Sequence, residues 1–218
     1  PSSAASDVYK RQALDGKGVE MFDGKEFHSY QIKDGITAGE TFTAHVDDFD
    51  NVWIGTFGGG VCYFDGEIWN SVDTRDGLLD DLVGSICSID GNKYWFGSEN
   101  GITAYIPKQQ TPSVFLDKIE TASESFSSIE DLLDKKGKIL QETRVTFTLK
   151  SNSFNTKKEK QKYIVNIIRK GIKESQLIKS NKFEFFPKEI GKYIIEFQSI
   201  DRDMNYSKLK QIEIKVVG

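Results

Sequence analysis

A block of about 42 residues repeats through the first half of the chain, and it constrains the fold more than any other feature. The recurring landmarks are Gly18-Val19, repeated as Gly60-Val61 and Gly101-Ile102; Asp23-Gly24, repeated as Asp65-Gly66; Asp34-Gly35, repeated as Asp76-Gly77; and Trp53-Ile54-Gly55, repeated as Trp95-Phe96-Gly97. A period of roughly 40–45 residues, built from short alternating apolar runs and glycine turns, is typical of β-propeller blades. Because a single blade does not bury its own apolar face, the repeat predicts blades that stack on one another.

One complete four-stranded blade is expected in the middle of this region. Its strands are Thr41–Val46, Val52–Thr56, Val61–Phe64 and Glu67–Val72. The Asp65-Gly66 pair between two apolar runs is a strong hairpin signal. Partial blades flank it, with strands Gly18–Phe22 and Glu26–Gln31 before it and Leu82–Ile89, Lys93–Phe96 and Ile102–Ile106 after it. The sequence therefore predicts one whole blade between two incomplete ones.

The repeat also carries a family resemblance. The stretches DDFDNVWIGTFGGGVCYFDG and SIDGNKYWFGSENGITAYIP, with the leader DGLLDDLVGSI, resemble two-component regulator propeller repeats. Such repeats form the extracytoplasmic sensor region of many bacterial hybrid histidine kinases. The resemblance implies a propeller that recognises a ligand, and it does not identify that ligand, since propellers host many unrelated functions.

The 42-residue period ends near Pro112, and a different pattern follows. Apolar or alternating runs occur at Arg144–Leu149, Tyr163–Ile168, Phe183–Phe186, Tyr193–Ile200 and Gln211–Val217. Several short strands separated by turn-rich and lysine-rich segments within about 100 residues predict a small β-sandwich. Ser127 and Glu130 have the spacing of a capping box, which predicts a short helical turn. The fold class expected for the chain is thus all-β, a partial propeller followed by an Ig-like sandwich.

This second half resembles the triple-tyrosine, Ig-like domain that follows regulator propellers in the same receptors. Tyr163 stands at the first tyrosine position of that family, and Gly191–Phe197 with Asp201–Ser207 matches its glycine-x-tyrosine strand and its Asp/Asn turn. Phe183 stands at the middle tyrosine position, and the tryptophan usual after the first tyrosine strand is absent. The order of the two parts, propeller and then sandwich, is that of the family.

Charge divides the chain at the same place as the repeat. Residues 1–110 carry 8 basic and 18 acidic side chains, a net charge of −10, whereas residues 111–218 carry 21 and 15, a net charge of +6. A shift of this size beside Pro107 and Pro112 indicates a domain boundary. Pro1–Gln12 resembles a translated sequencing adapter and is left out of the fold. The expected domains are therefore an adapter-like tail (1–12), a partial propeller (13–110) and a sandwich (111–218).

Several motifs with apparent chemistry are better explained by structure. Phe57–Gly60 is followed by a strand and not by the helix that a phosphate loop needs. Asp47–Asn51 lacks the length and the closing glutamate of a calcium loop, and its residue types favour a turn.

Cys62 and Cys87 are expected to be free and buried, although an exported protein could oxidise them. His28 and His45 have no triad-like neighbours in the sequence. Trp53, Trp69 and Trp95 are expected to pack between or within blades. The sequence thus predicts no catalytic residues, no metal and no cofactor.

Position, rather than residue chemistry, indicates where a ligand would bind. In a propeller, the loops that cross from an outer strand to the next inner strand share one rim with the turns between the second and third strands. Ligands commonly bind at that rim. The candidate rim residues are Thr37, Glu40, Asp80 and Asp81 from the crossing loops, with Phe57, Glu99 and Asn100 from the turns.

The function expected from these observations is extracytoplasmic signal reception. The propeller would bind a small molecule or an oligosaccharide, and the sandwich would relay the signal and offer a homodimer contact. Membrane attachment would come through sequence beyond this fragment, and the acidic first half with dispersed lysines in the second argues against nucleic acid. Two alternatives stay open: a propeller lyase or hydrolase that uses His45 with rim carboxylates, and an adhesion or structural protein without signalling.

Overall fold

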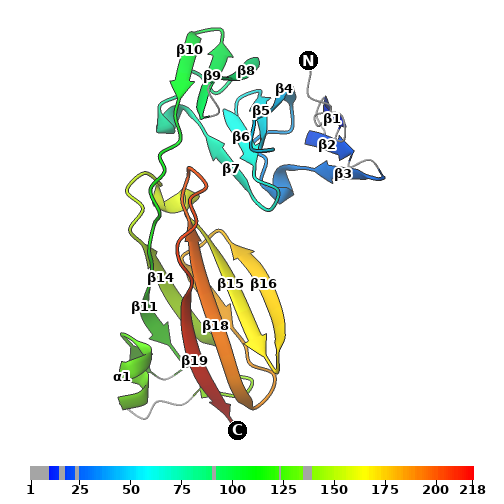
Figure 1. Cartoon of the computed structure of the whole chain (residues 1–218). Helices are drawn as coiled ribbons and strands as arrows, with labels where there is room; N and C mark the ends of the chain where they lie inside the picture. The colour runs from blue at the N-terminus through cyan, green and yellow to red at the C-terminus, as the bar shows by residue number, and fades with distance from the viewer. Residues whose placement is uncertain (1–9, 15–17, 23–24, 90–91, 123, 135–138) are drawn as a thin grey trace. The chain divides into compact units, whose positions relative to one another are not determined.

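The computed structural model describes residues 10–14, 18–22, 25–89, 92–122, 124–134 and 139–218. The chain divides into two compact units, residues 1–108 and residues 109–218, and each is described here by itself. Both units are built from antiparallel sheets, and the structure is all-β, a partial propeller and a sandwich (Figure 1). No helix among the described residues is long and apolar enough to cross a membrane.

Three small sheets make up the first unit. The first sheet contains β1 (Lys10–Leu14), β2 (Gly18–Phe22) and β3 (Phe27–Tyr30); the second contains β4 (Thr41–Val46), β5 (Val52–Thr56), β6 (Val61–Phe64) and β7 (Trp69–Val72); the third contains β8 (Ser85–Ile89), β9 (Lys93–Ser98) and β10 (Gly101–Tyr105). In each sheet the strands lie in chain order, as in a propeller blade. The complete middle blade was predicted correctly.

The repeat in the sequence corresponds to a repeat in space. Trp53 on β5 pairs with Tyr63 on β6, and Trp95 on β9 pairs with Ala104 on β10. Both tryptophans therefore occupy the second strand of a blade at the same register. The two sheets therefore repeat the same strand arrangement, as expected for successive blades.

The first blade has one more strand than the sequence predicted. Lys10, Arg11 and Gln12, which the sequence analysis leaves out of the fold, pair with β2, while residues 1–9 lie outside the described residues. Arg11 pairs with Met21, the register position that Trp53 has in the next blade. The backbone N–H and C=O groups at the edge of a strand such as β2 can pair with another strand largely independently of that strand's side chains.

Trp53 is the centre of the contact between the second and third blades. Its ring stacks on Tyr63 of its own blade at a centroid distance of 4.4 Å. On the other side it meets Tyr94 of the third blade at 4.0 Å and Phe96 at 6.0 Å. Only 2% of Trp53 is exposed. The expectation that Trp53 packs between blades is confirmed.

A buried carboxylate fixes this aromatic contact. Asp47 Oδ2 accepts hydrogen bonds from Trp53 Nε1 at 2.8 Å and from the Tyr94 hydroxyl at 2.6 Å. It also accepts one from the Asn51 side chain at 2.9 Å, while Oδ1 accepts from the backbone N–H groups of Phe49 and Asn51. All these donors leave no lone pair free for a cation, so the turn interpretation of Asp47–Asn51 is correct. Burial acts to raise the pKa of Asp47, but the bonds from Tyr94, Trp53 and Asn51 outweigh it and hold that pKa below its ordinary value.

The second unit is a two-sheet sandwich. One sheet has the order β12 (Ser125–Phe126), β11 (Val114–Glu120), β14 (Val145–Ser151), β17 (Lys182–Phe185), and the other has the order β13 (Ile139–Leu140), β19 (Lys210–Val217), β18 (Gly191–Ile200), β15 (Lys162–Arg169), β16 (Ile172–Ile178). Helix α1 (Ile129–Asp134) lies where a helical turn was predicted, but the cap is one residue later than expected: Ser128 Oγ accepts from Asp131 N at 3.0 Å, whereas Ser127 Oγ donates to the Asp131 carboxylate. Tyr163, Phe183 and Tyr193, the three positions matched to the tyrosine family, are all buried in the core between the sheets.

Four sandwich strands were not predicted. β11 has a bulge between Leu116 and Lys118, which breaks the alternation of its side chains. β16 is an edge strand that is exposed almost throughout, so no apolar period marks it. β12 and β13 have only two residues each. Such strands are formed by tertiary pairing and leave little signal in the sequence.

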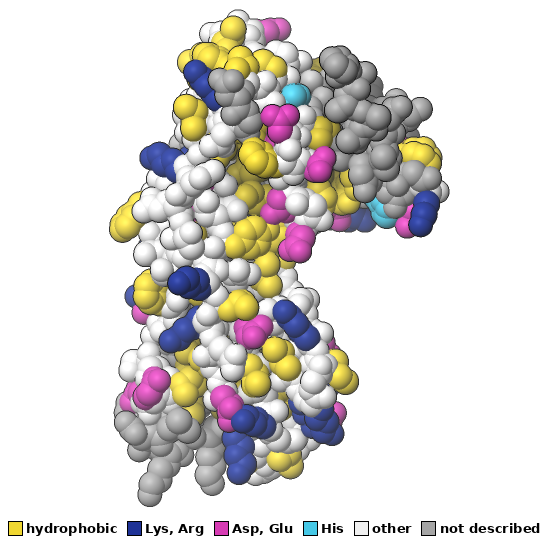
Figure 2. Space-filling model, viewed as in Figure 1, with side chains coloured by type: hydrophobic (Ala, Val, Ile, Leu, Met, Phe, Trp, Pro, Cys, Tyr) yellow, Lys and Arg dark blue, Asp and Glu magenta, His cyan; other side chains and the backbone are white. Residues whose placement is uncertain are grey.

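The surface reflects the charge division in the sequence. Figure 2 shows acidic side chains on the propeller unit and many lysine and arginine side chains over the sandwich unit. Neither cysteine is in a disulfide within the described part of the chain; Cys62 is buried and Cys87 exposed. The expectation of burial is therefore wrong for Cys87, because no described sheet covers the face of the third blade on which it lies.

We expect Asp47→Asn to lower the free energy of unfolding by about 3 kcal/mol at neutral pH, since an amide nitrogen would then face the donors of Trp53 and Tyr94. The lowered native pKa adds a pH dependence. Its stabilisation is complete above the ordinary pKa of 3.8 and is lost as the pH falls through the native pKa. Urea unfolding at several pH values from neutral to acidic measures the loss of unfolding free energy and its pH dependence, and Asp48→Asn, at an exposed position, is the control. If the loss of unfolding free energy in Asp47→Asn did not become smaller in acid, this account would be contradicted.

A pair of phenylalanines tests the sandwich core. Phe147 is fully buried between the sheets, whereas Phe154 is 91% exposed. We expect Phe147→Ala to cost about 3–5 kcal/mol of unfolding free energy, because it removes a packed ring and leaves a cavity. Phe154→Ala should change it by less than about 0.5 kcal/mol. Equal effects of the two substitutions, measured by chemical denaturation, would refute the assignment of the core.

Candidate ligand-binding rim

Four loops meet at one end of the propeller unit, and together they are called the rim. They are the crossing loops between β3 and β4 (residues 31–40) and between β7 and β8 (residues 73–84), with the β5–β6 turn (residues 57–60) and the β9–β10 turn (residues 99–100). Antiparallel strands place these loops on the same side of each blade. The rim contains all seven predicted site residues.

Backbone hydrogen bonds connect the loops of the rim. Phe57 N donates to the Glu40 carbonyl at 3.0 Å, which ties the β5–β6 turn to the first crossing loop. Gly58 N and Gly60 N donate to the Asp81 carbonyl at 3.0 and 2.8 Å, which ties the same turn to the second crossing loop. The β5–β6 turn is thus held between two neighbouring loops, and the rim has a defined backbone.

The two crossing loops are copies of each other. Each begins with a one-turn 3-10 helix, η1 (Ile32–Asp34) and η2 (Thr74–Asp76). The last residue of each helix returns its carboxylate to the backbone N–H of the residue before the helix, Asp34 to Gln31 and Asp76 to Asp73. A glycine with positive φ, Gly35 or Gly77, ends each helix. The repeated Asp-Gly pairs of the sequence are therefore loop-forming residues.

The structure gives the two aspartates of the second crossing loop different environments. Asp81 accepts hydrogen bonds from Thr74 N at 2.7 Å and from Thr74 Oγ1 at 3.1 Å, so its carboxylate stabilises the loop. Asp80 Oδ1 likewise accepts from Leu82 N at 2.9 Å within the loop, but its Oδ2 accepts from the Asn100 side chain at 2.6 Å, across to the β9–β10 turn of the next blade. Two predicted site residues, Asp80 and Asn100, are thus in direct contact and present their remaining polar atoms together.

The other predicted residues lie on the exposed part of the rim. Thr37 Oγ1 donates to the Gly59 carbonyl at 2.7 Å and contacts Cys62 Sγ at 2.9 Å, which joins the first crossing loop to the β5–β6 turn. Glu40 and Glu99 are exposed. Glu40 lies next to Phe57 through the backbone bond, whereas no contact between Glu99 and another predicted residue is seen in the described part of the rim.

An exposed aromatic pair was missed by the sequence analysis. The ring of Phe42, the second residue of β4, meets that of Phe57 edge-on at 5.7 Å, and both rings are about half exposed. The signal available was the position of Phe42 directly after a crossing loop, in the innermost strand of the blade. Two large apolar side chains left in solvent beside polar groups are characteristic of a binding surface.

Neither histidine joins the rim. His45 Nε2 lies 2.8 Å from Ser88 Oγ, so it bridges the inner strands of the second and third blades. It is near the β4–β5 turn, at the opposite end of β4 from the rim, and the rim carboxylates are not its partners. His28 lies 3.8 Å from Glu26 on the first blade. Among the described residues, no cluster of three metal-ligating side chains exists.

Neither a protein-family model nor a curated protein matches the chain. Solved structures do match. The extracellular domain of the putative hybrid two component system BT3049 from B. thetaiotaomicron aligns with a TM-score of 0.49 and 16% identity over 92% of this chain and 30% of that chain. The extracellular domain of a second such system from the same organism, BT4673, gives 0.36 and 14% over 94% and 34%. PorZ, a surface component of the type-IX secretion system of Porphyromonas gingivalis, gives 0.35 and 11% over 93% and 28%. The chain spans about a third of the length of these proteins.

Two glycines of the β5–β6 turn test the geometry of the rim. Both Gly58 and Gly60 have positive φ, but a Cβ on Gly60 would lie 2.2 Å from the Val72 carbonyl oxygen, whereas one on Gly58 would meet nothing within 4 Å. We expect Gly58→Ala to cost about 1 kcal/mol, the penalty of the left-handed conformation. Gly60→Ala should cost several times more, because backbone must move. Thermal unfolding compares them, and equal melting temperatures would show that the turn is built differently.

Proposed function

We propose that this chain is part of an extracytoplasmic sensor of the bacterial two-component type, in which the propeller rim binds the ligand. The observation that carries the proposal is the rim itself, where three loops are joined through their backbones around the exposed Phe42–Phe57 pair. The resemblance to regulator propeller repeats supports the sensor role. The structural matches lend it no weight, because their TM-scores lie below 0.5.

The side chains of the rim favour a neutral oligosaccharide as the ligand. Aromatic faces such as those of Phe42 and Phe57 pack against the apolar C–H faces of sugar rings. Asp80 and Asn100, paired at 2.6 Å, offer adjacent acceptors and donors to hydroxyl groups. Glu40 adds a carboxylate beside Phe57. Apolar and hydrogen-bonding groups thus alternate over the same surface, as recognition of a polyhydroxylated ligand requires.

The test is a binding measurement with the whole chain. Calorimetry with maltotriose, cellotriose, xylotriose and laminaritriose should identify at least one binder. We expect Phe57→Ala to weaken that binding by about tenfold or more, because it removes half of the aromatic pair. Phe27→Ala is the matched control, since Phe27 is also exposed but lies on β3 and away from the rim. No binding by any of the four sugars, or equal loss in both variants, would contradict a saccharide-binding rim.

The sandwich is proposed as the relay between the propeller and an output domain. Its edge strand β16 is exposed over Ile172–Leu177, and the described residues pair with it on one side only. This edge is where a homodimer contact would form. Membrane attachment and the output domain would lie beyond the fragment. Sedimentation of the chain with and without bound sugar distinguishes a relay through dimerisation from a sandwich that stays monomeric.

A hydrolase is the second candidate, and it rests on the contact between His45 and Ser88. A distance of 2.8 Å between Nε2 and Oγ is that of a general base and its nucleophile. Turnover of an acetate ester that disappears in both His45→Ala and Ser88→Ala would favour this candidate. Activity that survives either substitution would remove it.

A further inference from the structure

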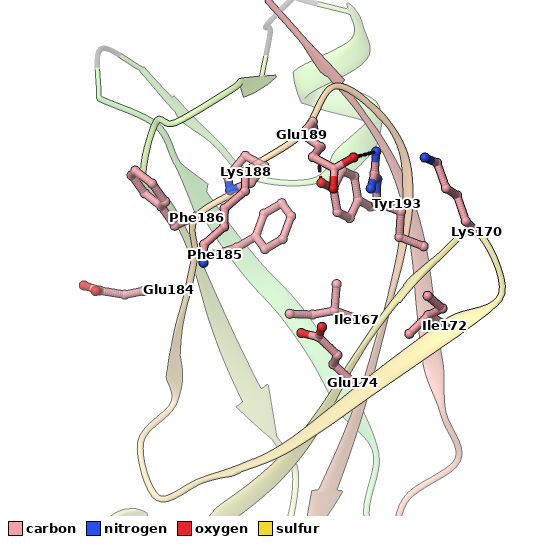
Figure 3. A pocket seen from close by; sticks show the side chains of 12 residues that line it. Ile167, Lys170, Ile172, Glu174, Glu184, Phe185, Phe186, Lys188, Glu189 and Tyr193 are labelled. Carbon is pink, nitrogen blue, oxygen red and sulfur yellow. Dashed lines mark hydrogen bonds and ion pairs between the residues drawn. The ribbon is translucent and has the colours of Figure 1, made fainter.

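The sandwich unit has a pocket with a volume of about 380 Å³ on its open side, between the edges of its two sheets. Residues of β15 and β16 line one wall, and the end of β17 with the loop that follows it lines the other (Figure 3). The pocket lies within one unit of the chain and is separate from the rim. A volume of this size suits a small molecule.

The floor of the pocket is apolar and rigid. It contains Phe185 and Tyr193, whose rings meet edge-on at 5.2 Å, together with Ile167. Phe185 and Tyr193 belong to the core of the sandwich and are only 4% and 6% exposed. Tyr193 is further fixed by a hydrogen bond from its hydroxyl to the Glu189 carbonyl at 2.9 Å. An aromatic or branched apolar group of a ligand would therefore find a preformed surface.

One end of the pocket has a net positive charge. The Arg169 guanidinium lies over the Tyr193 ring at 5.3 Å, forms an ion pair with Glu189 and donates to the Ile190 carbonyl at 3.3 Å. Lys170 follows in the β15–β16 turn, so two cations face one anion there. Hydrogen bonding and charge attraction from Arg169 hold the pKa of Glu189 below its usual range, so it remains ionised. The excess of one positive charge is therefore available to bind an anionic group of a ligand.

Glu174 of β16 places a negative charge in the pocket. The Glu174 carboxylate points into the cavity beside Ile167, away from Arg169 and Lys170 (Figure 3). No ion pair or hydrogen bond joins its side chain to another residue in the described part of the chain. Glu184, on the opposite wall, lies 3.5 Å from Arg144 in an exposed ion pair. The cavity thus has an apolar floor between a cationic end and an unpaired carboxylate.

We propose that this pocket binds a small amphipathic zwitterion, a short peptide with an aromatic side chain whose two charged ends lie on different residues. The ligand's carboxylate would lie at Arg169 and Lys170, its ammonium at Glu174, and its ring on Phe185 and Tyr193. Charge-assisted bonds at both ends orient such a ligand, and ring contact adds apolar burial. The sandwich would then be a second sensing module, independent of the sugar proposed for the rim.

Three probes that share a phenyl ring separate the contributions of charge. Glycylphenylalanine carries the two charges on separate residues, phenylacetate has only the negative one and phenethylamine only the positive one; L-phenylalanine, with both charges on one carbon, tests their separation. Titrations of the whole chain, followed through NMR signals of Phe185 and Tyr193, should give the tightest binding for the dipeptide. Equal binding of all probes, or no binding by any, would overturn the proposal.

Two substitutions assign the ends of the pocket. We expect Glu174→Gln to weaken binding of the dipeptide and of phenethylamine by about tenfold and to leave phenylacetate unchanged. Lys170→Gln should weaken binding of the dipeptide and of phenylacetate instead. Glu213→Gln, on the exposed surface of β19, is the control. Glu174 lies on an exposed edge strand, so its replacement keeps the core intact. Identical behaviour of Glu174→Gln and Glu213→Gln would refute the site, whatever sugars do at the rim.

Discussion

The hydrogen bonds of the Asp47 carboxylate determine how the second and third blades pack. A carboxylate that is almost fully buried is unfavourable unless its lone pairs are used, and here Trp53, Tyr94, Asn51 and two backbone groups use them. Because the donors come from both blades, the same charge closes a turn and joins two sheets. The Asp47 bonds hold Trp53 where it stacks on Tyr63 and meets the tilted ring of Tyr94.

The same turn chemistry recurs in the sandwich. Asp201 accepts from Asn205 N at 2.8 Å and from the Asn205 side chain at 2.9 Å, as Asp47 does from Asn51, and the fourth residue of each turn has positive φ. Burial is the largest influence on Asp201 and raises its pKa, whereas the bonds to Asp47 outweigh burial and lower its pKa. An aspartate and an asparagine four residues apart thus build a tight turn in either fold, and the Asp47 turn also binds a neighbouring sheet.

The two proposed sites are built from different structural elements. The rim is a property of loops, held by backbone bonds from Phe57 and Gly60 and therefore tolerant of changes in its side chains. The sandwich pocket is a property of two sheet edges that do not meet, with core rings as its floor and the Arg169–Glu189 ion pair at its end. A sensor with both could respond to two classes of ligand through separate parts of one chain.

The sequence by itself determined the blades, because a repeat with Trp, Gly and Asp-Gly at fixed spacing has one way to bury its apolar faces. It also determined which loops form the rim, because the connectivity of the strands places those loops at one end of each blade. Only the tertiary structure decided what side chains do in those places. It kept the Asp81 carboxylate on Thr74 of its own loop, joined one oxygen of Asp80 to Asn100, and brought Phe42 to Phe57. It also made strands such as β16, which pair through their backbone and leave no pattern, and with them the pocket that this edge of one sheet forms with Phe185 of the other.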